Sequence, residues 1–231
     1  MKVSIIGAGN VGATLGGSLL RDAKDVQVKY GVRNALSEKY AKLLEEQPEA
    51  TIDSVHDAIE WADAVILATS TPSSKSAYEE YAKSLGDGVK DKVIIDATNP
   101  LTVYPGLELW TRNVSGGEIL SSLLPQSYVF KAFNTLGYEL MAAADGRSMP
   151  GFTGHRLTML IAGPKEKKEV AERVVDLAGF EPCYVGPIRY ARNLEAIAEL
   201  WIHLGLEGVG PDLSWGRNFH FQAVGEIRNQ R

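Results

Sequence analysis

Short apolar runs alternate with amphipathic segments along most of this chain. The runs are rich in β-branched residues and lie at residues 2–6, 26–30, 64–68, 92–97, 129–133, 157–162 and 181–185. Between some of them apolar residues recur at helical spacing, which predicts helices over residues 37–46, 76–85 and 165–178. Continuous apolar strands separated by such helices are typical of a parallel sheet covered on both faces. The pattern therefore predicts an α/β fold of the Rossmann type, with a doubly wound, mostly parallel sheet in a single domain and a short helical C-terminal extension.

The alternating pattern and the C-terminal extension divide the chain unequally. Residues 1–190 carry the strands, whereas residues 191–231 carry one more helix, expected over residues 193–204, and a tail that combines glycines with aromatic side chains. The apolar positions of that helix are Leu194, Ile197, Ala198, Trp201 and Ile202. Such a stripe packs either on the chain's own sheet or on a second subunit, and we expect a homodimer formed through this region. The tail is too aromatic for plain disorder and is expected to pack on the same domain or on a partner subunit.

A glycine-rich motif directly follows the first apolar run. It consists of Gly7, Ala8, Gly9, Asn10, Val11 and Gly12, and a helical pattern continues from it to about Leu20. Gly7 permits a tight turn, Gly9 lets a pyrophosphate approach the backbone, and Gly12 lets the helix pack close to the strand. The unpaired N–H groups and positive dipole end of the helix favour phosphates. The motif predicts a dinucleotide site; the alternative is a tight turn that binds nothing.

The end of the second strand selects the dinucleotide. A site for NAD usually has an Asp or Glu about 20 residues after the glycines, which holds the ribose 2′-hydroxyl. Residues 26–34 contain no acid, and the strand ends in Gly31 and Val32, followed by Arg33. A guanidinium can bind a 2′-phosphate bidentately, which a carboxylate would repel. We therefore predict NADP(H), while a solvated loop arginine is the other interpretation of Arg33.

Polar residues also follow the later strands. Residues 69–71, Asn99 and Asn134 stand directly after three of the apolar runs. In an open α/β sheet, ligands bind outside the carboxyl ends of the strands. Any one of these residues could be a turn former or a helix cap. Their joint position at successive strand ends favours one shared ligand site.

Composition and charge exclude several classes of protein. The formal net charge of −5, without a run of Lys and Arg, argues against a nucleic-acid partner. No apolar run approaches the roughly 20 residues of a membrane span. Met1 and Lys2 lead directly into the first strand, so no signal peptide is expected and a cytoplasmic location follows. The single cysteine, Cys183, allows no internal disulfide and no metal-ligand spacing; its apolar neighbours predict an inert, buried thiol.

The sequence contains no convincing catalytic triad or pair of carboxylates. His155, Arg156 and His203 are expected to be structural or exposed, and so is His220, which stands between two phenylalanines. The least regular segment, residues 106–126, predicts a loop followed by a helix over residues 118–124. This loop either covers the site or is an inert surface excursion.

The chain resembles the coenzyme F420-dependent NADP oxidoreductase family, and it is similar to the NADPH-binding domain of the six-transmembrane metalloreductases. The matching segments are residues 7–12, 31–34, 96–100 and 131–135, and residues 208–213 resemble the glycine-rich end of the deazaflavin enzymes. The resemblance runs over nearly the whole chain, and it implies a Rossmann fold, NADP(H) as cofactor and coenzyme F420 or a flavin as second substrate.

The resemblance also implies a role for individual residues. Gly7 to Gly12 would hold the pyrophosphate, and Arg33 with Asn34 would bind the adenosine 2′-phosphate. Ala68, Thr69, Ser70 and Asn99 would run along the ribose and nicotinamide side. Ala132, Phe133 and Asn134 would lie near the nicotinamide. Val32 departs from the family pattern, because relatives often carry a serine there.

Such an enzyme would pass a hydride directly from the nicotinamide to a flavin-like ring, so positioning would dominate its rate. A reductase of free flavin or of ferric chelates stays open as an alternative. A protein of another class, an NADP(H) sensor without turnover, is equally consistent with the missing acid. Dehydrogenases with a large helical substrate domain are disfavoured, because only some forty residues follow the last strand.

Overall fold

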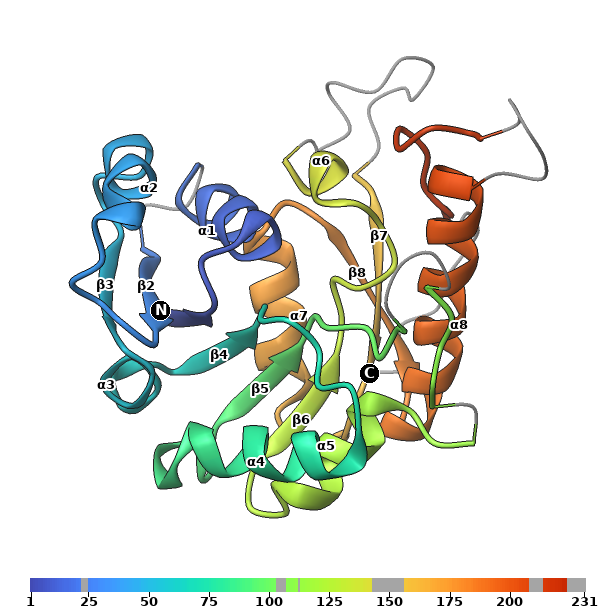
Figure 1. The fold of residues 1–231 in the computed structure, drawn as a ribbon, viewed down its shortest axis with the longest axis horizontal. Coiled ribbons are helices and arrows are strands. Elements are labelled where there is room, and N and C mark those ends of the chain that lie inside the picture. Colours follow the sequence, from blue (N-terminus) through green and yellow to red (C-terminus); the bar gives the residue numbers. More distant parts are fainter. Residues whose placement is uncertain (22–24, 103–106, 112, 143–155, 208–213, 224–231) are drawn as a thin grey trace.

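The computed structural model describes residues 1–21, 25–102, 107–111, 113–142, 156–207 and 214–223 (Figure 1). Its centre is an eight-stranded sheet in the order β3-β2-β1-β4-β5-β6-β7-β8. The strands are β1 (Lys2–Ile6), β2 (Gln27–Val32), β3 (Thr51–Ser54), β4 (Ala64–Leu67), β5 (Val93–Asp96), β6 (Tyr128–Lys131), β7 (Thr158–Ala162) and β8 (Glu181–Gly186). The order of the first six is that of a doubly wound dinucleotide-binding sheet. The predicted Rossmann-type fold is confirmed.

The first six strands are parallel to one another. β7 pairs with β6 in the antiparallel direction, through Lys131 and Ala162, and β8 runs parallel to β7. The sheet is therefore mostly parallel, as predicted, with a pair of reversed strands at one edge. Hydrophobic periodicity does not carry strand direction, so this reversal could not be read from the sequence.

Helices cover both faces of the sheet. They are α1 (Asn10–Arg21), α2 (Ala41–Glu46), α3 (Val55–Trp61), α4 (Lys75–Leu85), α5 (Gly116–Leu123), α6 (Tyr138–Met141), α7 (Lys168–Leu177) and α8 (Ala191–Ile202). Alternate residues of the central strands point to opposite faces, so that Ile66 joins the core cluster beneath α1 and α7. Its neighbour Leu67 joins the cluster beneath α3, α4 and α5. This two-sided burial explains why the strands are continuous apolar runs.

Short helical turns extend some of these elements. The 3₁₀ turns are η1 (Glu38–Tyr40), η2 (Asp87–Val89) and η3 (Ile188–Tyr190), and a π-helical turn η4 (His203–Glu207) follows α8. The helix predicted over residues 37–46 is therefore η1 followed by α2. The runs at 92–97 and 129–133 leave the sheet earlier than predicted, at Asp96 and Lys131. In the second case Phe133 takes a left-handed φ of 64°, which no strand allows.

The sequence patterns did not predict two elements, the edge strand β3 and the helix α3 that follows it. β3 contains one aliphatic side chain, Ile52, and is only partly buried, so it produces no apolar run. α3 follows without a loop. Its N-cap is Ser54, whose hydroxyl accepts a hydrogen bond from the backbone N–H of Asp57 at 3.1 Å. Because no loop divides the two elements and both are short, the alternation typical of a strand cannot be told apart from the helical spacing that follows it.

The C-terminal helix α8 lies beside β7 at one end of the sheet (Figure 1). Leu194, Ala198 and Trp201 of the apolar stripe are buried within this chain. Trp201 stacks on Phe219, with ring centroids 5.3 Å apart, and donates its indole N–H to the carbonyl of that residue at 2.9 Å. The described tail thus returns to α8, and Gln222 reaches β7 through a 3.0 Å bond from the Thr158 N–H. A homodimer remains a prediction.

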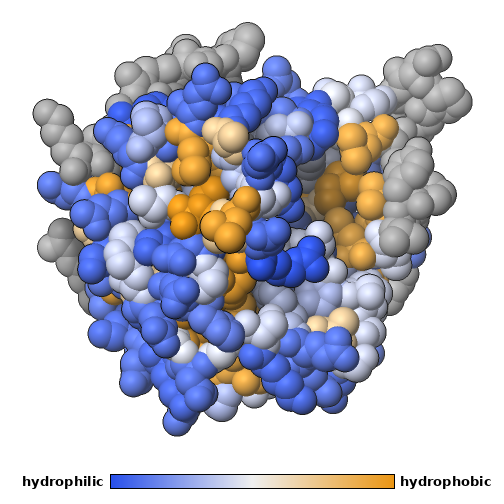
Figure 2. Space-filling view, turned by 60° about the vertical axis from the view of Figure 1, so that its left-hand side comes forward, coloured by the Kyte–Doolittle hydropathy of each residue, from blue (hydrophilic) through white to orange (hydrophobic). Residues whose placement is uncertain are grey.

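The surface seen from the β3 side is largely hydrophilic, with separate hydrophobic areas, one of which lines a hollow (Figure 2). Within the described ranges no helix has the length and apolar character that a membrane crossing requires.

A buried tyrosine on β2 provides a test of how the first helix is held. The Tyr30 hydroxyl donates to Gln47 Oε1 at 2.6 Å, while Gln47 Nε2 donates to the carbonyl of Ala13 in α1 at 2.8 Å. Tyr30→Phe should lower the free energy of unfolding by about 1–2 kcal/mol, because it leaves a partly buried acceptor, Gln47 Oε1, without its donor. Urea unfolding measures this. Tyr40→Phe, whose hydroxyl has no hydrogen bond within the described chain, is the control, and equal losses in both would contradict the prediction.

Candidate functional site

The carboxyl ends of β1, β2, β4, β5 and β6 meet at one edge of the sheet, and the predicted site residues follow them. β1 and β4 are neighbours at the point where the strand order reverses. In doubly wound sheets the ligand crevice lies at this reversal. The structure thus brings the glycine turn, Arg33, the segment after β4, Asn99 and Asn134 to a common edge.

The glycine turn after β1 is closely enclosed. Gly7 has a φ of +105°, and its N–H donates to the carbonyl of Gly31 at 3.0 Å. A Cβ atom on Gly7 would lie 2.6 Å from the Ala68 carbonyl oxygen, and one on Gly12 would lie 2.1 Å from the Gly7 oxygen. Both glycines therefore let β1, α1 and the end of β4 approach closely, as the sequence predicted.

The middle glycine of the motif, Gly9, is not required by any close contact with the described residues. A Cβ atom on Gly9 would meet no atom within 4 Å, and its φ is not in the left-handed region. Gly9 and Asn10 are exposed, Ala8 and Val11 are half-buried, and α1 begins at Asn10. The first turn of α1 contains no acidic residue. Open space in front of an uncompensated helix N-terminus fits a bound phosphate.

Arg33 and Asn34 follow β2 and are exposed. Asn34 Oδ1 accepts from the N–H of Leu36 at 3.2 Å, which shapes the turn. In the described part of the chain no carboxylate pairs with the Arg33 guanidinium. Asp53 on the neighbouring strand β3 is bound to Lys29 at 3.0 Å, and hydrogen bonding to Lys29 lowers the pKa of that carboxyl. Arg33 is thus available to an anion.

The segment after β4 faces partly inward. The Thr69 hydroxyl donates to the Tyr81 hydroxyl at 2.9 Å, so it is committed to α4. Ala68 is half-buried and Ser70 is exposed. Of these three residues, Ser70 is the one whose side chain is free to meet a ligand, and Ala68 and Thr69 would contribute backbone.

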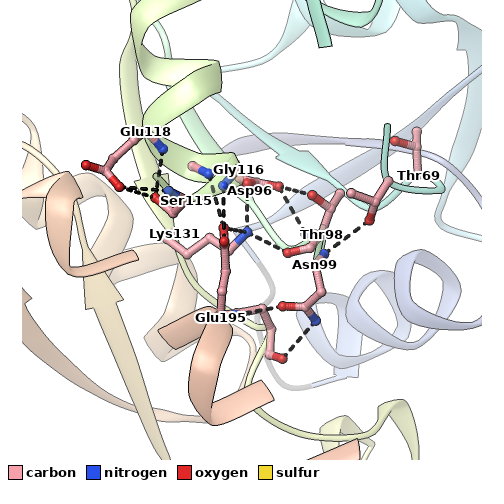
Figure 3. Close-up of polar contacts among 12 residues, drawn as sticks. Thr69, Asp96, Thr98, Asn99, Ser115, Gly116, Glu118, Lys131 and Glu195 are labelled. Carbon is pink, nitrogen blue, oxygen red and sulfur yellow. Dashed lines mark hydrogen bonds and ion pairs between the residues drawn. The ribbon is translucent and has the colours of Figure 1, made fainter. Parts of the chain in front are cut away.

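Asn99 and Asn134 form a reciprocal pair across the ends of β5 and β6. Asn99 Nδ2 donates to the carbonyl of Asn134 at 3.1 Å, and Asn134 Nδ2 donates to Asn99 Oδ1 at 3.0 Å. The backbone N–H of Asn99 donates to Thr71 Oγ1 at 3.2 Å, as Figure 3 shows. Asn134 is 4% exposed, yet its Oδ1 has no hydrogen-bond partner among the described residues. A buried acceptor of this kind requires a donor, which a bound ligand or a water can provide.

Ala132 and Phe133 are fully buried and belong to the core. The Phe133 ring packs edge-on against Phe180, with centroids 5.8 Å apart. Its side chain therefore faces away from the strand-end edge, and any contact that Phe133 makes with a nucleotide comes from the backbone. The left-handed φ of this residue turns the chain so that Asn134 reaches Asn99.

A buried charge cluster beneath these asparagines was missed by the sequence reading. Lys131 Nζ lies 2.9 Å from Asp96 Oδ2 and 2.9 Å from Glu195 Oε1. All three residues are at most 1% exposed. Desolvation opposes the charge on Lys131, but the two carboxylates outweigh it and raise the pKa of its ammonium. The sequence did contain a signal for two members of the cluster, because Asp96 and Lys131 are charged residues within the apolar runs at 92–97 and 129–133. No feature of the sequence indicated that Glu195 joins them.

The residues expected to be structural have structural roles where they are described. Arg156 donates to Asp176 Oδ1 at 2.9 Å and to the carbonyl of Phe180. Cys183 is buried in β8, and burial raises the pKa of its thiol. His220 Nε2 binds the carbonyl of Thr158 at 2.9 Å, and burial lowers the pKa of this imidazole. His155 lies outside the described residues.

The irregular segment is held to its surroundings where it is described. The Leu109 N–H donates to Glu199 of α8 at 2.6 Å, and Trp110 contacts Tyr78 with ring centroids 6.0 Å apart. The predicted helix over residues 118–124 is α5, which begins at Gly116. Residues 106 and 112, and the glycine-rich segment 208–213, lie outside the described residues, so a covering role of this loop stays a prediction.

Comparisons with known proteins agree with this fold. A protein from Arthrobacter sp. FB24, a candidate F420-dependent NADP-reductase, has a solved structure that aligns over 97% of this chain and 100% of its own, with 26% identity and a TM-score of 0.79. A hypothetical protein from Sinorhizobium meliloti aligns over 83% and 88%, with 21% identity and a TM-score of 0.67. A reductive aminase from Aspergillus terreus in complex with NADPH aligns over 89% and 62%, with 18% identity and a TM-score of 0.61, and shares the fold.

Among curated proteins, the metalloreductase STEAP3 of Rattus norvegicus is 26% identical over 198 residues. The alignment covers 85% of this chain but 36% of that relative, so the chain spans about a third of its length. Residues 2–100, which run from β1 to Pro100 and include Arg33 and Asn99, match the model of the family described as "NADP oxidoreductase coenzyme F420-dependent". The resemblance of this chain to the F420-dependent NADP oxidoreductases is therefore confirmed, and residues 2–100 carry the sequence signature of that family.

Proposed function

We propose that the protein is an NADP(H)-dependent oxidoreductase that transfers a hydride between NADPH and a flavin-like acceptor such as a deazaflavin. The observation that carries this proposal is the occurrence, on one sheet edge, of an open glycine turn at Gly9 and of the Arg33 guanidinium, which pairs with no carboxylate among the described residues. The first fits a pyrophosphate and the second fits a 2′-phosphate. NADP(H) carries both groups.

The charges along this edge support the phosphorylated nucleotide. The exposed cation of Arg33 follows β2, and the neighbouring acid Asp53 is neutralised by Lys29. The N-terminus of α1 adds a second positive end without a local acid. An anion reaching from α1 to Arg33 would meet favourable charge along its length.

The nicotinamide would lie at the Asn99–Asn134 pair. The unpartnered Oδ1 of Asn134 is an acceptor that a carboxamide N–H₂ would satisfy. When bound, the nicotinamide supplies the hydride, so the protein needs to bind and orient rather than to transfer protons. Ser70, Asn99 and Asn134 would hold the ribose and nicotinamide, with backbone contacts from Ala68, Thr69, Ala132 and Phe133.

Two other functions are favoured by particular observations. Similarity to a metalloreductase supports reduction of a flavin or a ferric chelate at the same edge. In the described chain, Asn99 and Asn134 make no hydrogen bond to an acidic or basic side chain, which is equally suited to a sensor that binds NADP(H) without turnover. All three functions share the nucleotide site; the two enzymes differ in the acceptor, and the sensor has none.

A panel of acceptors separates these functions. NADPH oxidation is followed at its absorbance maximum with coenzyme F420, with FMN or FAD, and with a ferric chelate. The proposed function requires turnover with the deazaflavin. Turnover with FMN, FAD or the ferric chelate but not with the deazaflavin supports the flavin or ferric reductase alternative, and tight NADPH binding without any turnover supports the sensor.

Arg33→Ala tests the choice of dinucleotide. The variant should raise the KM for NADPH by about 10- to 100-fold and change the KM for NADH by less than about two-fold, because it removes a charge-assisted bond to the 2′-phosphate alone. Steady-state kinetics with both cofactors measure the two constants. Arg189→Ala, which removes an exposed arginine from η3, is the control. Equal effects on NADPH and NADH would rule out the assigned role of Arg33.

Gly9→Val tests the pyrophosphate position. Apart from its neighbours along the chain, no atom of the described residues lies within 4 Å of the new Cβ, so the variant should fold and melt like the wild type. The valine would fill the space of the pyrophosphate, and NADPH titration by calorimetry should show a loss of binding. Gly17→Ala, two turns along the same helix, should bind normally. A folded Gly9→Val protein with wild-type affinity would refute this placement.

A further inference from the structure

We propose that Glu195, on the C-terminal helix α8, is a positioning residue for the nicotinamide end of the site, acting on Asn99 and Asn134 through Lys131. This inference rests on the proposed function, because it assigns how one part of the NADP(H) site is held. Glu195 stands 61 residues after Asn134 in the sequence, and its partners are Gly116, Gly117 and Lys131. Hydrogen bonds connect it to the Thr98 carbonyl, and the peptide bond between Thr98 and Asn99 completes the connection.

The first step joins α8 to α5 and to β6. Glu195 Oε2 accepts from the Gly116 N–H at 3.0 Å, and its Oε1 accepts from the Gly117 N–H at 3.1 Å and from Lys131 Nζ at 2.9 Å. A Cβ atom on Gly116 would lie 2.2 Å from the Tyr78 hydroxyl, so this helix start is tightly enclosed. The carboxylate therefore has one well-defined position.

The second step passes from Lys131 to the turn after β5. Lys131 Nζ donates to Asp96 Oδ2 at 2.9 Å and to the carbonyl of Thr98 at 2.5 Å. Asp96 Oδ1 accepts from both the N–H and the hydroxyl of Thr98, at 3.0 and 2.7 Å. The backbone of Thr98 is thus bound on both sides, by a cation at its carbonyl and by a carboxylate at its N–H (Figure 3).

The third step reaches the edge of the sheet. Thr98 immediately precedes Asn99, so fixing its carbonyl fixes the peptide plane that leads into Asn99. The Asn99 amide then binds Asn134 reciprocally, at 3.1 and 3.0 Å. That pair in turn orients the unpartnered Asn134 Oδ1. A shift of the Lys131 ammonium would therefore move the acceptor that faces the nicotinamide.

An apolar contact would anchor α8 at a lower cost in desolvation. Burying charged groups costs free energy that their mutual attraction often only offsets, so a buried ion pair is weak evidence of added stability. The cluster contains one cation and two carboxylates, and the Gly116 and Gly117 N–H groups at the start of α5 compensate the second negative charge. What the cluster supplies, and an apolar contact could not, is a directed bond to the Thr98 carbonyl.

A second ion pair between the same two helices provides a matched control. Arg192 of α8 binds Glu118 of α5 through two bonds of 2.7 Å. Partial burial opposes the charge on Glu118, but bonds from Arg192 and Ser115 lower the pKa of its carboxyl to about 2. This pair links α8 to α5 on the surface and has no contact with β5 or β6 among the described residues. Breaking it loosens the helix contact without touching Lys131.

The experiment compares Glu195→Gln with Arg192→Gln in the full chain. Glutamine keeps the shape of Glu195 but sets an N–H₂ against backbone N–H donors, so one bond of the cluster must be lost. Two ligands are titrated by calorimetry: NADPH, and 2′,5′-ADP, which lacks the nicotinamide half. In parallel, the side-chain amide signals of Asn99 and Asn134 are recorded by NMR in ¹⁵N-labelled protein, without any ligand.

Glu195→Gln should weaken NADPH binding by about ten-fold and leave 2′,5′-ADP within about two-fold, since it disturbs one hydrogen-bonded end of the site. It should also shift the amide signals of both asparagines. Arg192→Gln should change none of the three. Should Glu195→Gln fail to fold, Asp96→Asn weakens the same series from the β5 side and should give the same split.

Two results would overturn the inference. One is a folded Glu195→Gln protein with wild-type amide signals and wild-type affinity for both ligands. The other is an equal loss for NADPH and 2′,5′-ADP, which would indicate general loosening of the fold. A wild-type protein that binds neither ligand would instead overturn the proposed function, and this is decided by the wild-type titrations alone.

Discussion

A cation buried at the carboxyl end of β6 constrains a large part of this molecule. Lys131 is fully buried, and its ammonium requires compensation, because an isolated charge in the interior costs several kcal/mol. Asp96 provides one partner from the neighbouring strand, and Glu195 provides the other from the C-terminal helix. The positions of α8, of the start of α5 and of the turn after β5 all follow from this requirement.

The two halves of the candidate site are built in different ways. At β1 and β2 the protein offers space and charge: an open backbone at Gly9, a helix N-terminus and an exposed Arg33. At β5 and β6 it offers side-chain amides whose positions depend on a buried network. The first half suits recognition of phosphates, which tolerate variation in geometry. The second half suits the reacting ring, whose orientation sets the rate of hydride transfer.

Most of the fold and half of the site follow from the sequence. The first half of the site lies within one continuous segment, which contains β1, the glycine turn, α1 and Arg33. Its chemistry can therefore be inferred from residue types and spacing. β3 and α3 were missed because each is short and partly exposed. The reversal of β7 was invisible because apolar periodicity has no direction. The inward orientation of Phe133, by contrast with that of Asn134, depends on a left-handed φ that residue types do not reveal.

By itself the sequence determined that a parallel sheet forms, that its first loop suits a pyrophosphate and that a cation follows β2. These are properties of neighbouring residues. Only the tertiary structure decided that Glu195 meets Lys131, that Thr98 is bound from both sides and that Asn99 pairs with Asn134. The bonds from Lys131 to the Thr98 carbonyl and from Asn99 to Asn134 join residues 33 and 35 positions apart. The packing of the helices on the sheet determines which of these residues meet, and a local sequence pattern contains no information about that packing.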